Sequence, residues 1–199
     1  MNPGQQYIAL PQLLVDIRAC RHCEDNLPCG PRPIVAAHQD ASILIIGQAP
    51  GLRVHKSGVP WDDASGQRLR EWMGIDPSVF YDETKIALVP MGFCYPGTGK
   101  SGDLPPRPEC EELWHERLLA ELTNVKMTLV IGAYAQRFRL GKSRKATLTA
   151  TVQAWKEYRP ASLALPHPSP RNNIWLKKNP WFETDVVPYL KSRVTRLLK

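Results

Sequence analysis

The chain has 199 residues, 43% of them hydrophobic, so it is long enough for one well-buried core and short for two. We therefore expect a single domain over residues 1–199. Lys and Arg outnumber Asp and Glu by 26 to 19, and this excess of positive charge favours an anionic partner such as nucleic acid. The plainer explanation is that these charges only keep the surface soluble.

The sequence also excludes several classes of protein. No apolar run approaches the roughly 20 residues of a membrane span, and the N-terminus lacks the pattern of a signal peptide, so we expect a cytoplasmic protein without a membrane partner. We expect it to be a monomer. The five cysteines are an odd number. In a reducing compartment this favours metal ligation or free thiols over a disulfide framework.

Strands alternate with helices along the chain. Short β-branched runs that end at glycine, such as residues 41–47, are typical of parallel strands buried on both faces, and we expect a three-layer α/β sandwich around a mostly parallel four-stranded sheet. The segment 20–33 is rich in Pro, Gly and Cys and predicts a loop, as does 95–108. In chain order the remaining predictions are a helix at 12–20, a helix at 65–74 capped by Ser65, a strand at 85–91, a helix at 108–122, a strand at 127–132, a helix at 133–141, a strand beginning at 162, and a basic amphipathic helix at 183–199.

Unusual residues follow three of the predicted strands. Residues 47–51 form a Gly-Gln-Ala-Pro-Gly turn, Cys94 lies just past the second strand, and His167 opens a His-Pro-Ser-Pro-Arg-Asn loop. Ligands bind at the carboxyl ends of the strands in parallel sheets, so these groups are expected to converge. Two of these groups have a plainer interpretation. Residues 47–51 can be an ordinary strand-to-helix turn, and the loop that begins at His167 can be a proline-rich surface turn.

The sequence resembles a known family in several of these segments. Residues 47–69 are similar to the first motif of the family 4 uracil-DNA glycosylases, which runs Gly-Glu-Ala-Pro-Gly, a spacer, Gly-X-Pro-Phe and Ala-Gly. Residues 131–141 resemble a Gly-X-X-Ala segment of that family, and residues 167–172 its histidine loop. The segments occur in the same order over most of the chain. The resemblance implies the uracil-DNA glycosylase fold and a DNA glycosylase that acts in base excision repair.

The resemblance also implies roles for individual residues. His167 would donate a hydrogen bond to the base carbonyl where negative charge develops, and the backbone around residues 47–51 would hold the base and the attacking water. Trp61 would stack on a base extruded from the duplex, although a core tryptophan is the plainer interpretation. The predicted site residues are His167 and Gln48 for catalysis, Gly47, Ala49, Pro50, Gly51, Trp61 and Ser169 for the substrate, and Ser65, Gly66 and Arg171 for DNA.

Two positions depart from the family pattern. Gln48 stands where family 4 has a glutamate, and an amide can orient a water molecule but cannot act as a general base. Pro90 stands where the family has the asparagine that reads the edge of uracil. Asp62 and Asp63, beside Trp61, are the carboxylates nearest in sequence to the predicted pocket, and either can position the attacking water. The plainer interpretation is that they are solvated acids of a turn or of a helix cap.

The cysteines form two pairs, Cys20 with Cys23 and Cys94 with Cys110. Four thiolates suit either a four-iron four-sulfur cluster or tetrahedral zinc, and ligand number does not distinguish the two. The resemblance to family 4 implies the iron–sulfur cluster. Cys29 can replace one of the four ligands or be a spare buried thiol, and we favour the spare thiol.

Three hypotheses follow from the sequence. The first is an active glycosylase for uracil or another deaminated or damaged base, with lesion-containing DNA as its partner. The second is a lesion-binding protein that keeps the pocket and has lost catalysis, as the changes at Gln48 and Pro90 suggest. The third is a cluster-bearing redox or scaffold protein, which leaves the His167 loop unexplained.

Overall fold

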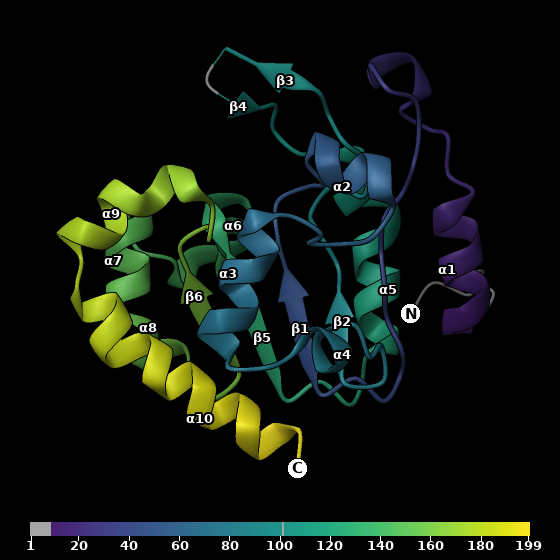
Figure 1. The fold of residues 1–199 in the computed structure, drawn as a ribbon. Helices are drawn as coiled ribbons and strands as arrows, with labels where there is room; N and C mark the ends of the chain where they lie inside the picture. Colours follow the sequence, from purple (N-terminus) through teal and green to yellow (C-terminus); the bar gives the residue numbers. More distant parts are fainter. Residues whose placement is uncertain (1–8, 101) are drawn as a thin grey trace.

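A four-stranded parallel sheet forms the centre of the protein. We describe a computed structural model, which covers residues 9–100 and 102–199. The strands are β1 (Ile43–Ile46), β2 (Ile86–Leu88), β5 (Met127–Ile131) and β6 (Ser162–Leu165), in the order β2-β1-β5-β6. Ile43 pairs with Ile86 on one side and with Met127 on the other. The predicted α/β sandwich is confirmed, and its sheet is parallel throughout (Figure 1).

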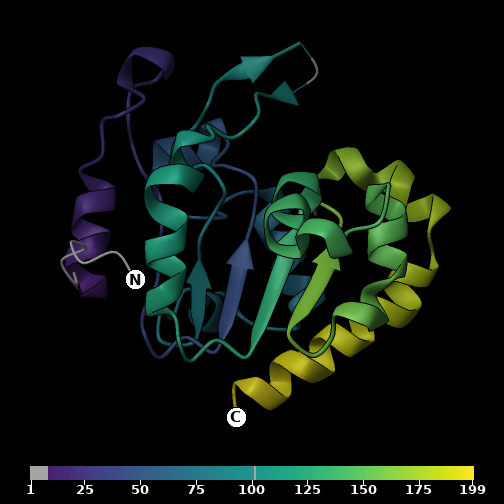
Figure 2. The same ribbon diagram turned by 180° about the vertical axis from the view of Figure 1, so that it is seen from behind.

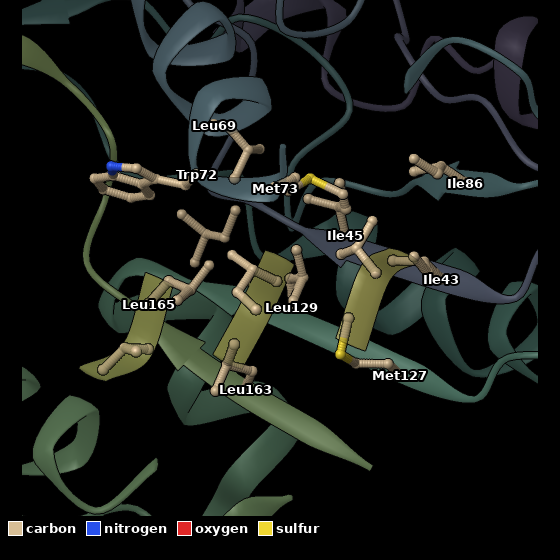
Figure 3. Close-up of a cluster of buried hydrophobic side chains, with 14 of the residues drawn as sticks. Ile43, Ile45, Leu69, Trp72, Met73, Ile86, Met127, Leu129, Leu163 and Leu165 are labelled. Carbon is tan, nitrogen blue, oxygen red and sulfur yellow. The ribbon is translucent and has the colours of Figure 1, made fainter. Parts of the chain in front are cut away.

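The strands are buried on both faces because their apolar runs alternate between two core clusters. Ile43 and Ile45 of β1 lie in the cluster beneath α3 (Ala64–Met73) and α10 (Val187–Leu197), and Leu44 and Ile46 lie in the opposite cluster. Figure 3 shows Leu69, Trp72 and Met73 of α3 above the strand residues of the first cluster.

The second face of the sheet is covered by helices from three parts of the chain. These are α1 (Leu10–Arg18), α5 (Glu116–Glu121) and α6 (Gly132–Leu140), and they contribute Leu13, Leu118 and Ala135 to the second cluster. Figure 2 shows α5 and α6 in front of the sheet, on the side opposite to α3 and α10. Helix layers on both faces leave the strand ends as the place where loops can form a site.

Several elements differ from the sequence prediction. The segment 95–108, predicted as a loop, contains a short antiparallel hairpin of β3 (Thr98–Gly99) and β4 (Gly102–Asp103), which projects beyond the carboxyl ends of the strands (Figure 1). The predicted helix at 108–122 begins with a π-helical turn, Glu111–His115, and the C-terminal helix at 183–199 is divided into a π-helical turn, Phe182–Val186, and α10. The sequence prediction also lacked α2 (Leu52–Ser57), α4 (Pro77–Phe80), α7 (Leu148–Gln153), α8 (Trp155–Tyr158) and α9 (Asn173–Lys178).

The start of α3 corrects another prediction. The N-cap residue is Asp63, whose carboxylate accepts a hydrogen bond from Gly66 N at 2.8 Å, and Ser65 already lies inside the helix. Asp is as good an N-cap as Ser, so two candidate residues stood next to each other in the sequence. Within the described residues, no helix combines the length and the apolar character required to cross a membrane.

Candidate functional site

A cleft of about 600 Å³ lies at the carboxyl ends of the strands. Loops from β1, β2 and β6, the N-terminus of α3 and the β3–β4 hairpin meet there, as expected for a parallel sheet. The predicted site residues in its lining are Gly47, Gln48, Ala49, Pro50, Gly51, Trp61, Ser65, His167, Ser169 and Arg171.

The turn after β1 forms one side of the cleft. The carbonyl of Gly47 accepts a hydrogen bond from Met91 N at 3.0 Å, and the carbonyl of Gln48 accepts one from Gly92 N at 2.9 Å. These bonds fix the turn against the segment that follows β2. The side-chain amide of Gln48 donates to the Leu104 carbonyl at 3.5 Å, so its Nε2 faces the end of the hairpin.

Trp61 is held in place by two glycines and an unusual backbone conformation. Its φ angle is 58°, in the left-handed region that non-glycine residues seldom adopt. A Cβ added to Gly47 would lie 2.8 Å from Trp61 Cζ2, and a Cβ added to Gly66 would overlap the Trp61 carbonyl. The indole therefore packs against bare backbone, in the cleft lining and beside the core.

His167 lines the cleft and stacks with Trp61, with ring centroids 5.8 Å apart and planes inclined by 26°. Burial lowers the pKa of His167, and the negative charge of Asp63 opposes this effect. The imidazole is therefore expected to be neutral at pH 7. Its Nδ1 accepts a hydrogen bond from Ser169 N at 3.2 Å, so the single proton resides on Nε2. This tautomer can donate to a ligand oxygen.

The loop after His167 is braced from both ends. The side-chain amide of Asn172 donates to the His167 carbonyl at 2.7 Å, and Arg68 of α3 donates to the Ser169 carbonyl at 3.3 Å. The side chain of Ser169 accepts from Arg171 N at 3.3 Å. These bonds fix the direction of the imidazole without using Nε2.

The structure separates the two neighbouring aspartates. Asp63 lies in the cleft lining and caps α3, whereas Asp62 faces Arg53 at 3.7 Å and is not part of the lining. It also separates the two predicted phosphate contacts, because Ser65 lines the cleft while Gly66 lies beneath Trp61 with its amide bonded to Asp63. The placement of Gly66 therefore does not support a contact with DNA.

Pro90 forms part of the cleft wall at the end of β2. A buried histidine, His115, supports this wall from the protein interior. Its Nε2 lies 3.2 Å from the Met91 carbonyl, and its ring stacks on Phe93 with centroids 5.4 Å apart. Burial lowers the pKa of His115 to about 4, so the ring is neutral. The sequence analysis missed this residue, because a lone histidine in a helix carries no recognisable signal.

The list of predicted site residues also lacked several polar or glycine residues of the cleft. Among them are Arg53 at the start of α2, Gly102 and Asp103 on the hairpin, and Asn172 after the histidine loop. Gly102 and Asp103 could not be identified beforehand, because they lie in a glycine-rich segment whose composition predicts a plain loop. Asn172 was in the motif, but only the fold shows that it supports the His167 backbone.

The paired cysteines lie at a second, smaller cavity. Cys20, Cys23, Cys94 and Cys110 all line it, together with apolar neighbours such as Phe93. Cys29 is exposed and outside this lining, so the expectation that it is a buried thiol is wrong. Among the described residues, no three metal-ligating side chains are grouped as needed for a single ion.

Burial changes the chemistry of these thiols. It raises the pKa of Cys94 to about 11 and that of Cys110 to about 12, and burial together with Glu109 raises the pKa of Cys23. Thiolates at these positions therefore need a positive partner. Arg107, which pairs with Glu109, also hydrogen-bonds Cys23 and supplies part of that charge.

The family model described as the uracil DNA glycosylase superfamily matches residues 35–191 of the chain. The matched range includes the β1 turn, the hairpin and the histidine loop. It begins after Cys29 and so includes only the second cysteine pair.

Proposed function

The chain belongs to the uracil DNA glycosylase superfamily, and on this premise we propose that it hydrolyses the N-glycosidic bond of uracil or of another deaminated or damaged base in DNA. The observation that carries the proposal is the state of His167. A neutral imidazole with its proton on Nε2 stacks with Trp61 in a cleft at the strand ends. This arrangement suits a reaction in which a base departs with negative charge.

In the proposed reaction a base extruded from DNA enters the cleft and lies near Trp61, at a cost of about a few kcal/mol in lost stacking and pairing. The Nε2 proton of His167 is donated in a hydrogen bond to a carbonyl oxygen of the base. This bond strengthens as the C1′–N bond breaks and charge collects on the oxygen. The bracing of the loop by Asn172 and Arg68 keeps the donor in position before the reaction begins.

The attacking water is assigned to the β1 turn. Gln48 offers an amide that can orient this water, although it cannot take the proton. Pro90 offers no side-chain amide to the base, so the cleft lacks at this position the paired hydrogen bonds that select uracil. We therefore infer a broader substrate class, deaminated or damaged bases with a carbonyl oxygen within reach of His167.

The test is excision from end-labelled oligonucleotides that carry uracil, hypoxanthine or xanthine, followed by alkali cleavage at abasic sites. We expect a cut at one or more of these bases, reduced about 10²-fold or more in His167→Ala. His38→Ala removes a histidine from the segment before β1, outside the cleft lining, and serves as the matched control. The proposal fails if the wild-type protein cuts none of the substrates, or if His167→Ala cuts as fast as His38→Ala.

A second candidate function is binding of lesion DNA without hydrolysis. Gln48 and Pro90 favour it, because both replace side chains that the family pattern uses in catalysis and base reading. It predicts tighter binding to lesion-containing than to undamaged oligonucleotides, with no abasic product. Fluorescence anisotropy on the same oligonucleotides separates this outcome from excision.

We further propose that the four cysteines hold a four-iron four-sulfur cluster, which would place the chain with the family 4 enzymes. In such a cluster each cysteine binds a different iron, so the sulfurs lie further apart than around one zinc ion. Cys20, Cys23, Cys94 and Cys110 line one shared cavity, and this common lining supports the proposal. When bound, the cluster would cross-link residues 20–23 to residues 94–110.

Anaerobic purification followed by iron, sulfide and zinc analysis tests the cluster. We expect iron and sulfide in equal amounts and visible absorbance near 400 nm. Cys23→Ala should lose the iron, the sulfide and the absorbance. Cys29→Ala, at the exposed cysteine outside the cavity, should keep them. Stoichiometric zinc in place of iron would contradict the assignment.

A further inference from the structure

The reaction proposed for the cleft needs a group that accepts a proton from the attacking water, and Gln48 cannot serve as this group. Hydrolysis by water releases a proton, and an amide cannot accept it at neutral pH. Among the described residues that line the cleft, the carboxylates are Asp63 and Asp103. The water-activating base is therefore to be sought between these two.

Asp63 is already engaged. Its carboxylate accepts the Gly66 amide at 2.8 Å as the N-cap of α3. Its negative charge also acts on His167, which places it on the side of the cleft where the leaving base would be held. A carboxylate in this place serves the helix and the imidazole rather than the water.

Asp103 lies beside the β1 turn. A Cβ built on Gly51 would lie 3.3 Å from Asp103 Oδ2, so the carboxylate lies directly against the end of that turn. The next residue, Leu104, supplies the carbonyl that accepts the Gln48 amide at 3.5 Å. The carboxylate of Asp103 and the amide of Gln48 thus approach the same part of the cleft.

The Asp103 side chain is free to bind water. Among the described residues it has no side-chain hydrogen bond or ion pair, and it is exposed to solvent. The hairpin that carries it is anchored on two sides. Leu104 N donates to the Gly97 carbonyl at 2.8 Å, and the Arg171 guanidinium occupies the space beside Gly102 that a Cβ would fill.

We propose that Asp103 is the general base of the reaction, with Gln48 orienting the water that it activates. This inference rests on the proposed glycosylase function. The water oxygen forms a bond to C1′ of the deoxyribose while the C1′–N bond breaks and its electron pair leaves with the base. The water proton passes to Asp103. The base anion is hydrogen-bonded by His167 and is protonated on release, so the products are an abasic sugar and the neutral free base.

The assignment is tested by single-turnover excision with enzyme in excess, on the best substrate of the wild-type protein. Asp103→Asn is expected to lower the rate about 10²–10⁴-fold, with unchanged or tighter binding to uncleaved DNA. Asp103→Glu should retain part of the rate, and added formate should partly restore Asp103→Ala. Asp40→Asn removes the same charge from the segment before β1, outside the cleft lining, and should leave the rate unchanged.

The outcomes separate this assignment from the proposed function. If the wild-type protein is active and Asp103→Asn cuts within about twofold of it, Asp103 is not the base. If Asp63→Asn shows the loss and Asp103→Asn does not, the base is Asp63. If the wild-type protein has no activity on any substrate, the proposed function fails and the assignment falls with it. Thermal unfolding of each variant checks that a lost rate is not lost folding.

Discussion

Trp61 shows how single residues build the cleft. Its indole contacts the Gly47 backbone on one side and the His167 ring on the other, while its carbonyl covers Gly66. A side chain in this position needs a left-handed φ and two neighbours without Cβ atoms. The motif spacing therefore reflects packing as much as substrate recognition.

Gly66→Ala tests this packing. In an ordinary helix the change to alanine is stabilising by up to about 1 kcal/mol. Here the new Cβ overlaps the Trp61 carbonyl, so we expect a loss of roughly 1–3 kcal/mol in the free energy of unfolding. Urea unfolding measures it, with Gln67→Ala at an exposed site of the same helix as the control. Equal stability of the two variants would show that Trp61 can move at little cost.

His115 makes the stability of the protein depend on pH. Its pKa falls from 6.5 to about 4 on folding, so between these values the unfolded chain binds more protons and the native state is destabilised as pH decreases. This loss in the free energy of unfolding is nearly absent at pH 7.5 and reaches about 2 kcal/mol at pH 5. We expect His115→Leu to reduce the difference between urea unfolding at these two pH values by about this amount. If the difference in stability between the two pH values is the same in His115→Leu as in the wild-type protein, His115 is not its source.

The helices and strands show what the sequence could predict. β1 is a continuous apolar run, and β5 and β6 are apolar apart from Thr128 and Ser162. Such runs identify buried strands because both faces must be covered. The hairpin was missed because its strands have two residues each and contain glycines, so they carry no periodicity. α2, α7 and α9, with six residues each, are too short for an apolar face to repeat.

The part of the candidate site that follows the strands was predictable from the sequence, and the part that depends on tertiary contacts was not. The residues of the β1 turn and the histidine loop follow strands, and strand ends are brought together by the sheet itself. Asp103 comes from a hairpin between two cysteines, and only tertiary contacts with Gly51 and Arg171 show that it reaches the cleft. Asp62 and Asp63 are adjacent in sequence, and only the start of α3 decides which one faces inward.

The start of α3 yields a prediction that separates two roles of Asp63. Asp63→Ala removes the cap and should cost about 1 kcal/mol of stability, whereas Asp63→Asn keeps an acceptor for Gly66 N and should cost much less. Both changes remove the charge that raises the pKa of His167, so both should lower that pKa further. Urea unfolding and NMR titration of the His167 ring measure the two effects. Equal stability of the two variants would exclude the capping role.

At the scale of the whole molecule, the chain carries a net positive charge, and arginines as well as aspartates line the cleft. The formal net charge is +7, and Arg53 and Arg171 lie in the cleft lining. Phosphate contacts from such side chains release counterions, which makes DNA binding depend on salt. Net charge by itself does not show where DNA binds.

Arg171→Ala distinguishes a phosphate contact from general attraction. If Arg171 neutralises one phosphate, the slope of log affinity against log salt concentration decreases in magnitude by about 1. Lys126→Ala removes the same charge near the opposite ends of the strands and should leave the slope unchanged. Anisotropy titrations over a range of salt concentrations provide both slopes. The same change in both variants would indicate that Arg171 acts only through net charge.

The position of Pro90 has a consequence for which side chains the cleft wall can carry. The neighbouring amides of Val89 and Met91 donate to Ile45 and Gly47, while residue 90 lies between these bonds and needs no amide of its own. A proline is tolerated there, and so is a residue with a polar side chain. The chemical group that this position presents to the cleft can therefore change while the hydrogen bonds that hold the β1 turn stay the same.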